Sequence, residues 1–152
     1  MRVSAKTDYA LRAALELAAA PDEKPVKGER IATAQTIPLR FLENILMQLR
    51  HAGLVESRRG AEGGYRLARP PAEVTLADVI RAIDGPLAGV SGARPETLDF
   101  TGVAEPMRDV WIAVRASLRS VLEHVTLADV VAARLPEHVT AMLGDEDAWV
   151  SH

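Results

Sequence analysis

The side chains best suited to specific chemistry lie in two short stretches, PLRFLENILMQLRHAG and VESRRGAEGGYRLA. The first holds Arg40, Glu43 and Asn44, and these residue types hydrogen-bond to the edges of guanine, cytosine and adenine, respectively. The second holds Arg58 and Arg59 beside three glycines, and guanidinium groups bind phosphate oxygens through charge-assisted hydrogen bonds. These two stretches therefore indicate recognition of a nucleic acid.

Catalysis and metal binding lack their usual residues. Cysteine is absent, which excludes disulfides, thiol catalysis, thiolate zinc sites and ordinary cysteine-ligated iron–sulfur clusters. The histidines, at positions 51, 124, 138 and 152, show no metal-ligand spacing, so only a site assembled in space from oxygen or His-plus-carboxylate ligands stays open. No serine lies in a nucleophile–His–Asp pattern. We therefore expect no enzyme activity, no catalytic residues and no resident metal or cofactor.

Charge is distributed unevenly along the chain. Residues 1–70 carry 12 basic and 8 acidic side chains, whereas residues 71–152 carry 6 basic and 13 acidic ones. A basic first half suggests that this half contacts a polyanion, although ordinary surface scatter gives the same imbalance. No apolar run approaches the roughly 18 residues of a membrane span, and charged residues interrupt the N-terminus. We therefore expect no membrane association, no signal peptide and a cytoplasmic location.

A small set of elements must position the two stretches. Apolar periodicity and turn residues predict helices over residues 7–20, 28–35 and 38–52, followed by strands over residues 54–58 and 64–68. Gly53 is expected to cap the third helix at its C-terminus. This order of helix, helix–turn–helix and hairpin is typical of a winged helix-turn-helix, in which the second helix of the motif enters the major groove of DNA.

The third predicted helix has two unlike faces. One face is apolar and is expected to pack on the body of the domain: Leu39, Leu42, Ile45, Leu46 and Leu49. The opposite face is mostly polar: Arg40, Glu43, Asn44, Met47 and His51. Such a face suits the reading of base edges, and it equally suits a plain solvated helix surface. Arg58 and Arg59 at the tip of the hairpin would add phosphate contacts, and one of them could enter a narrow minor groove.

The second half of the sequence begins with the helix LADVIRAID, which Thr75 and Asp78 are expected to cap. A loop over residues 86–105 shows no clear periodicity, and loops of that length are usually functional or disordered. A long helix from Pro106 then carries an apolar stripe, and a second capped helix and an acidic tail follow it. The chain therefore divides into residues 1–85, 86–105, 106–135 and 136–152.

Several motifs resemble a known family. The opening MRVSAKTDYALRAALELA, the block PLRFLENILMQLRHAGLVESRRGAEGGYRL and the segment TLADVIRAID are similar to the Rrf-two-type winged helix-turn-helix transcriptional regulators, the family of the IscR, NsrR and CymR types. The resemblance is close over residues 1–85 and looser over the long helix. It implies a mostly α-helical fold with a two-stranded wing and a long C-terminal dimerisation helix. It also implies a homodimer that represses transcription from a two-fold-related site on double-stranded DNA.

The resemblance gives roles to individual positions. Arg40, Glu43 and Asn44 match base-reading positions, and Arg59, next to Arg58, matches the wing arginine that enters the minor groove. The residues expected to approach phosphates are Arg2, Ser4, Lys6 and Tyr9. The residues expected at the dimer interface are Met107, Val110, Trp111, Val114, Leu118, Val121 and Leu122. Arg40 stands where relatives often have a small hydroxyl residue, and Pro38 departs from the usual helix start, so the preferred operator is expected to differ.

The loop over residues 86–105 departs from the family pattern. Cluster-binding relatives place three cysteines between the helix after the wing and the long helix, whereas this loop contains neither cysteine nor histidine. We therefore expect regulation without an iron–sulfur cluster. The loop could form a small-molecule pocket with Phe100, Met107 and Trp111, bind a protein effector, or serve only as a connection. The alternative function is a protein-interaction adaptor of the same fold that regulates or senses a metabolic enzyme.

Overall fold

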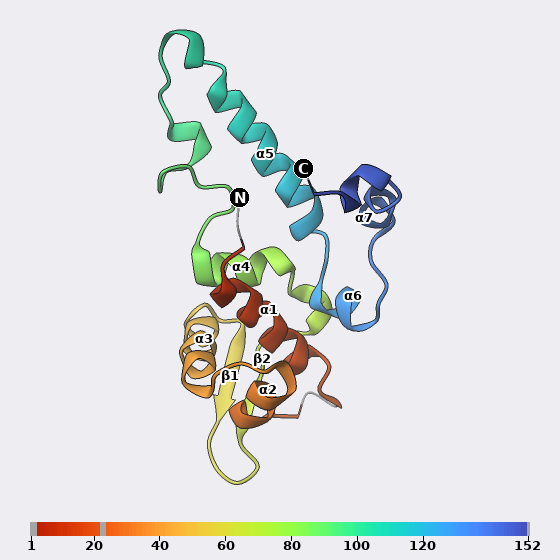
Figure 1. The fold of residues 1–152 in the computed structure, drawn as a ribbon. Coiled ribbons are helices and arrows are strands. Elements are labelled where there is room, and N and C mark those ends of the chain that lie inside the picture. The colour runs from red at the N-terminus through yellow and green to blue at the C-terminus, as the bar shows by residue number, and fades with distance from the viewer. Residues whose placement is uncertain (1–2, 22–23, 152) are drawn as a thin grey trace.

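Helices make up most of the protein, and an antiparallel hairpin projects from one end of it (Figure 1). A computed structural model describes residues 3–21 and 24–151. The helices are α1 (Ala5–Ala18), α2 (Gly28–Gln35), α3 (Leu39–His51), α4 (Leu76–Asp84), α5 (Met107–Leu122), α6 (Leu127–Val131) and α7 (Glu137–Met142). The strands are β1 (Val55–Arg58) and β2 (Gly64–Leu67). Short 3-10 helices cover Pro71–Glu73, Pro95–Thr97, Gly102–Ala104 and Glu146–Trp149. The predicted mostly α-helical fold with a two-stranded wing is confirmed.

α1 forms the centre of the first half, where it packs against α2, α3, α4 and β2. Its inner face carries small side chains, and Ala10, Ala13 and Ala14 are almost completely buried. Small side chains let α3 approach closely, and α3 places its apolar residues in the same core: Leu42, Ile45, Leu46 and Leu49. Each fully buried leucine or isoleucine stabilises the fold by about 2 kcal/mol, because its apolar surface is removed from water. The inner face of α3 is therefore firmly held, and its outer face is left to solvent.

α1 begins two residues before the predicted start at residue 7. Ser4 provides the reason, because its hydroxyl accepts a hydrogen bond from the Thr7 backbone amide at 3.1 Å and so caps the helix. The helix also ends at Ala18 rather than at residue 20. Apolar periodicity alone locates the buried middle of a helix and leaves both ends to local capping contacts.

The C-terminus of α3 follows the prediction. Gly53 adopts a left-handed conformation, with φ of 75°. Its amide donates to the Arg50 carbonyl and the Leu54 amide donates to the Leu49 carbonyl, both at 3.0 Å. This pair of bonds is the Schellman cap, for which glycine is preferred because it lacks a Cβ. The cap turns the chain directly into β1, so the hairpin starts at a defined angle to α3.

The hairpin is attached to the body of the domain through one pair of backbone hydrogen bonds. β1 and β2 pair from Val55↔Leu67 to Arg58↔Gly64. Val26, in the segment before α2, exchanges backbone hydrogen bonds of 2.7 and 2.8 Å with Tyr65 of β2. Gly64 makes this approach possible, since a Cβ at that position would lie 2.5 Å from the Val26 carbonyl oxygen.

The two predicted capping pairs are both present, and they lie side by side. Thr75 and Asp78 form a complete capping box at the start of α4, as Thr126 and Asp129 do at the start of α6. Thr75 and Thr126 also pair in an antiparallel bridge, with the Leu76 amide donating to the Val125 carbonyl at 3.0 Å and the Leu127 amide to the Val74 carbonyl at 2.9 Å. The end of α5 is thereby tied to the start of α4.

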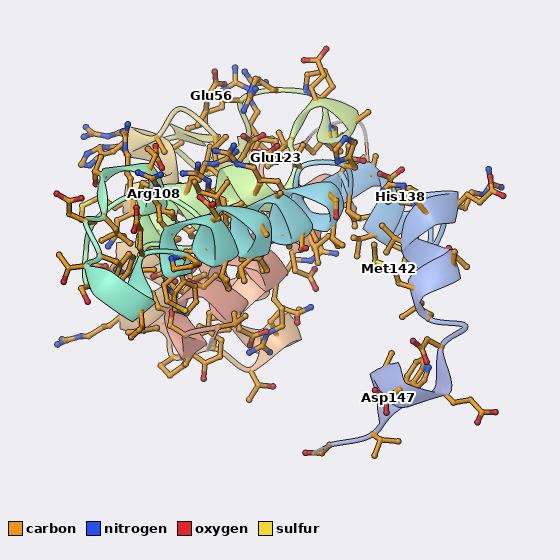
Figure 2. All side chains as sticks on the ribbon, turned by 90° about the horizontal axis from the view of Figure 1, so that it is seen from above. Glu56, Arg108, Glu123, His138, Met142 and Asp147 are labelled. Carbon is orange, nitrogen blue, oxygen red and sulfur yellow. The ribbon has the colours of Figure 1, made fainter. Side chains whose placement is uncertain are left out.

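α5 points away from the rest of the molecule, at the end opposite the hairpin, and the chain over residues 86–105 runs beside it (Figure 1). None of its described residues is buried. The segment predicted as a tail, residues 136–152, contains α7 and a 3-10 turn. Its His138 lies beside the C-terminal end of α5, where the imidazole Nε2 is 2.8 Å from the Ser120 carbonyl oxygen (Figure 2).

Candidate nucleic-acid interface

The outer face of α3 displays the three residues expected to read bases. Arg40, Glu43 and Asn44 are all exposed, and they stand opposite the buried leucines that hold the helix. Asn44 accepts a hydrogen bond from Gln48 one turn later, at 2.8 Å. No described side chain pairs with Arg40 or Glu43. A rigid helix with unpaired polar side chains on its outer face has the form that groove reading requires.

One residue of the predicted apolar face is placed differently. Leu39 is 36% exposed, whereas the other four members of that face are completely buried. The reason is its position as the first residue of α3, where it lies against a shallow surface cavity formed with α2 and the turn between the helices. Pro38, expected inside the first turn, is the N-cap residue and has extended backbone angles.

Phe41 is an exposed residue that the sequence analysis did not select, and it connects Tyr9 to α3. The two rings meet edge to face, with centroids 5.7 Å apart. The Arg12 guanidinium lies over the Tyr9 ring at 4.8 Å and donates to the Gln35 carbonyl at 2.8 Å. These contacts join α1, the end of α2 and the start of α3. An aromatic residue next to the polar positions of α3 is the signal that could have revealed it.

The other residues expected to approach phosphates are not gathered in one place. Arg2 lies outside the described residues. Ser4 is occupied by internal contacts, since its hydroxyl caps α1, donates to Thr7 Oγ1 at 3.0 Å and lies 3.4 Å from the Asp84 carboxylate. Lys6 is half-buried on α1. The structure therefore brings Tyr9 to the start of α3 and brings Ser4 to the end of α4.

Arg58 and Arg59 stand exposed at the end of the hairpin, and no described carboxylate lies within ion-pair distance of either. A third wing arginine differs, because Arg66 pairs with Glu56 across the strands at 2.9 Å. The hairpin is also tied to α3, since the guanidinium of Arg50 donates to the Ser57 hydroxyl at 3.0 Å. Two positive charges thus remain available on a loop whose position relative to α3 is set.

The residues predicted at the dimer interface form a stripe along α5 that the protomer covers only in part. Met107 and Val110 are 37% and 47% exposed. The remaining members are partly exposed: Trp111, Val114, Leu118, Val121 and Leu122. α5 touches the protomer chiefly through the 3-10 turn Pro95–Thr97 and the end of α4. A 16-residue helix with a partly exposed apolar stripe is the form of an element that packs against another chain.

The loop over residues 86–105 does not bring the three proposed pocket residues together in the cavities that adjoin it. One cavity, of 570 Å³, lies between α1, α4 and α5 and is lined by Thr7, Asp84 and apolar side chains. A second, of 230 Å³, has four arginines among its nine lining residues. Within the described part of the chain, no group of three or more His, Asp or Glu side chains could hold a metal ion. Guanidinium groups have no lone pair to offer a cation, so this region does not fit an iron centre.

None of the helices in the described ranges has the length and hydrophobicity to cross a membrane.

Comparisons with known proteins place this geometry in context. The Rrf2 family model, described as "Iron-dependent Transcriptional regulator", matches residues 3–133. The chain is 52% identical to Rv1287 of Mycobacterium tuberculosis, named as an HTH-type transcriptional regulator, over 99% of this chain and 94% of that protein. It is 36% identical to the HTH-type transcriptional regulator CymR of Bacillus subtilis, over 87% of this chain and 91% of CymR.

Solved structures of two such regulators have the same fold. The structure of CymR, the global cysteine regulator of B. subtilis, superposes with a TM-score of 0.74 at 34% identity, over 88% of this chain and 98% of that one. The structure of T. potens IscR superposes with a TM-score of 0.71 at 34% identity, over all of this chain and 93% of that one. The likeness extends from the hairpin domain into the long helix and beyond it.

Proposed function

Since the chain belongs to the Rrf2 family of transcriptional regulators, which have a DNA-binding fold and are not enzymes, we propose that it represses transcription as a homodimer bound to a two-fold-related operator. The observation that carries the proposal is the pairing of two exposed surfaces on one rigid unit. These are the outer face of α3, with Arg40, Glu43 and Asn44, and the hairpin tip, with Arg58 and Arg59.

α3 is the element that reads sequence in this proposal. Its buried leucines and its C-terminal cap fix its axis, so the outer side chains enter the major groove without a further ordering cost. Arg40 can bond two acceptors of guanine, Asn44 can bond adenine through its amide, and Glu43 can accept from the cytosine amino group. Each good pair discriminates against the wrong base by about 1–3 kcal/mol.

The hairpin supplies affinity and position. Arg58 and Arg59 are unpaired within the described protomer, so neither must break an ion pair before it meets DNA. One of them enters the minor groove where it is narrow and most negative, and the other contacts the neighbouring phosphate. Phosphate contacts release counterions, so binding weakens steeply as salt rises.

Dimerisation through α5 places two such units across a two-fold axis. The support is the partly exposed stripe from Met107 to Leu122. If the stripes of two protomers packed together, apolar surface of both chains would be removed from water. Two recognition helices related by this axis would read half-sites about one helical turn apart. The absence of cysteine argues that the dimer works without an iron–sulfur cluster, with a small molecule or a protein as its effector.

The test is selection of bound fragments from sheared genomic DNA by the purified protein, followed by footprinting of the recovered site. We expect protection of a two-fold-related sequence with half-sites about one turn apart. Arg59→Ala should weaken binding to every duplex, and Glu43→Gln should chiefly change base preference. Arg66→Ala is the matched control, because Arg66 lies on the same hairpin and is already paired with Glu56. Equal binding of all duplexes by the parent, Arg59→Ala and Glu43→Gln proteins would contradict the proposal.

A further inference from the structure

A small cavity between the two halves of the protomer has a composition that DNA binding does not explain. It has a volume of 230 Å³ and lies where α4, the loop over residues 86–105 and α5 meet. Four arginines contribute to its lining: Arg81, Arg94, Arg115 and Arg119. They come from three segments that are separate in the sequence. The fold therefore gathers guanidinium groups that no local pattern brings together.

The carboxylates beside the cavity balance only part of this charge. Glu123 pairs with Arg81 of α4 and also lies 3.5 Å from the Nε of Arg119. Figure 2 labels Glu123, which directly follows the last residue of α5. The remaining described acid at the cavity, Glu96, pairs with Arg115. Four guanidinium groups against two carboxylates leave an excess of two positive charges, and no described acid lies within ion-pair distance of Arg94.

The charge balance holds at neutral pH. A hydrogen bond from its own backbone lowers the pKa of Glu96 below the ordinary value, and the hydrogen bond from Arg115 lowers it further. Glu96 is therefore a carboxylate that pairs with Arg115, and the charge of Arg94 also acts on it from beyond ion-pair distance. The side chain of Arg115, which pairs with Glu96, is only 16% exposed. A guanidinium so largely removed from water interacts more strongly with an anion than one on an open surface.

We propose that this cavity binds a compact dianion, a phosphate, a sulfate or a small dicarboxylate, between Arg94, Arg115 and the α4 arginine Arg81. The excess of two positive charges matches a doubly charged ligand. The planar guanidinium fork presents parallel N–H donors that suit the paired oxygens of such groups. A volume below the roughly 300–1,000 Å³ of ordinary small-molecule pockets favours an ion of few heavy atoms.

Two other occupants fit the cavity poorly. A metal cation finds no lone-pair donor on the arginines. The hairpin tip and α5 lie at opposite ends of the molecule with α4 between them (Figure 1), and the cavity opens between α4 and α5, so DNA bound at the hairpin tip would lie away from it. A carboxylate of a second copy is the remaining competitor, and the experiment below separates it from a free anion.

The experiment is calorimetric titration of the full-length, DNA-free protein with sodium phosphate, sodium sulfate or sodium succinate at constant ionic strength, with chloride as the background anion. We expect saturable binding of one of these classes, and the three arms distinguish a phosphoryl, a sulfuryl and a dicarboxylate ligand. Arg94→Gln and Arg115→Gln should each weaken the affinity by roughly tenfold or more, as loss of a charge-assisted hydrogen bond requires. Arg108→Gln is the matched control, since Arg108 lies on α5 outside the cavity and its substitution removes the same charge.

Absence of saturable binding in all three arms would overturn the proposal, whether the cavity is empty or filled by a carboxylate of the second copy. An equal loss of affinity in Arg108→Gln would overturn it too, because general charge screening would then explain the binding. Arg94 is exposed, so Arg94→Gln decides the matter if Arg115→Gln fails to fold. No DNA is present, so this test can fail while operator binding stands, and the reverse also holds.

Discussion

Gly64→Ala is expected to break the contact between the hairpin and the segment before α2, and to destabilise the protein more than a comparable glycine substitution. The new Cβ would lie 2.5 Å from the Val26 carbonyl oxygen, so the backbone must move. That movement breaks the two hydrogen bonds between Val26 and Tyr65, each worth about 1 kcal/mol net. Gly64 also has φ of +145°, a conformation that costs a non-glycine residue about 1–3 kcal/mol. The total loss is therefore about 3–5 kcal/mol.

Gly60→Ala is the matched control for that prediction. Gly60 lies on the same hairpin with φ of +102°, and a Cβ there meets nothing within 4 Å. It carries the backbone strain without the clash, and alanine restricts the unfolded chain equally at both positions. Urea unfolding at one protomer concentration should therefore show Gly64→Ala less stable than Gly60→Ala by about 2 kcal/mol. A difference below about 1 kcal/mol would refute the idea that contact with Val26 holds the hairpin.

Three further outcomes are expected. Val110→Glu should convert the protein to a monomer by light scattering and should weaken operator binding, because a charge would enter the α5 stripe. Thr75→Ala and Thr126→Ala should each lower the free energy of unfolding in urea by about 1 kcal/mol. The double variant should lose less than the sum of the two single losses, because the two caps are bridged. The lowered pKa of Glu96 gives stability that is fully present above the ordinary value of 4.5 and is lost as pH falls through the lowered pKa. Arg115→Gln should reduce this pH dependence without abolishing it, because the backbone hydrogen bond that lowers the pKa most stays in place.

Local signals in the sequence were sufficient for most of the winged-helix half, residues 1–85. The apolar spacing of α3, the glycine after it and the glycines around the hairpin each specify one conformation with little help from distant residues. The same holds for Thr75 and Thr126, whose partners lie three residues away. The sequence did not show that these two caps lie side by side, since bridge pairing depends on the path of the whole second half.

The predictions that the structure corrected depend on contacts between elements. The start of α1 is set by Ser4, which apolar periodicity ignores, and the exposure of Leu39 depends on where the neighbouring helix stops. Phe41 connects α3 to α1 only because its ring meets the ring of Tyr9 edge to face. The arginine-lined cavity is invisible from sequence for the same reason, since its members are spread from α4 to α5 and no spacing relates them.

The bridge between the segments 74–76 and 125–127 determines how a change in the packing of two α5 helices would affect operator binding. Val125 follows the end of α5, and its carbonyl is hydrogen-bonded to the amide of Leu76, the first residue of α4. α4 packs along α1, and α1 in turn packs against α3. Each of these contacts is either a backbone hydrogen bond or buried packing, so the chain from α5 to α3 has little freedom to absorb a rotation. A change in how two α5 helices cross should therefore alter the separation of the two recognition helices. Arg81 and Glu123 span this same junction, which places the arginine-lined cavity beside the element that sets the spacing.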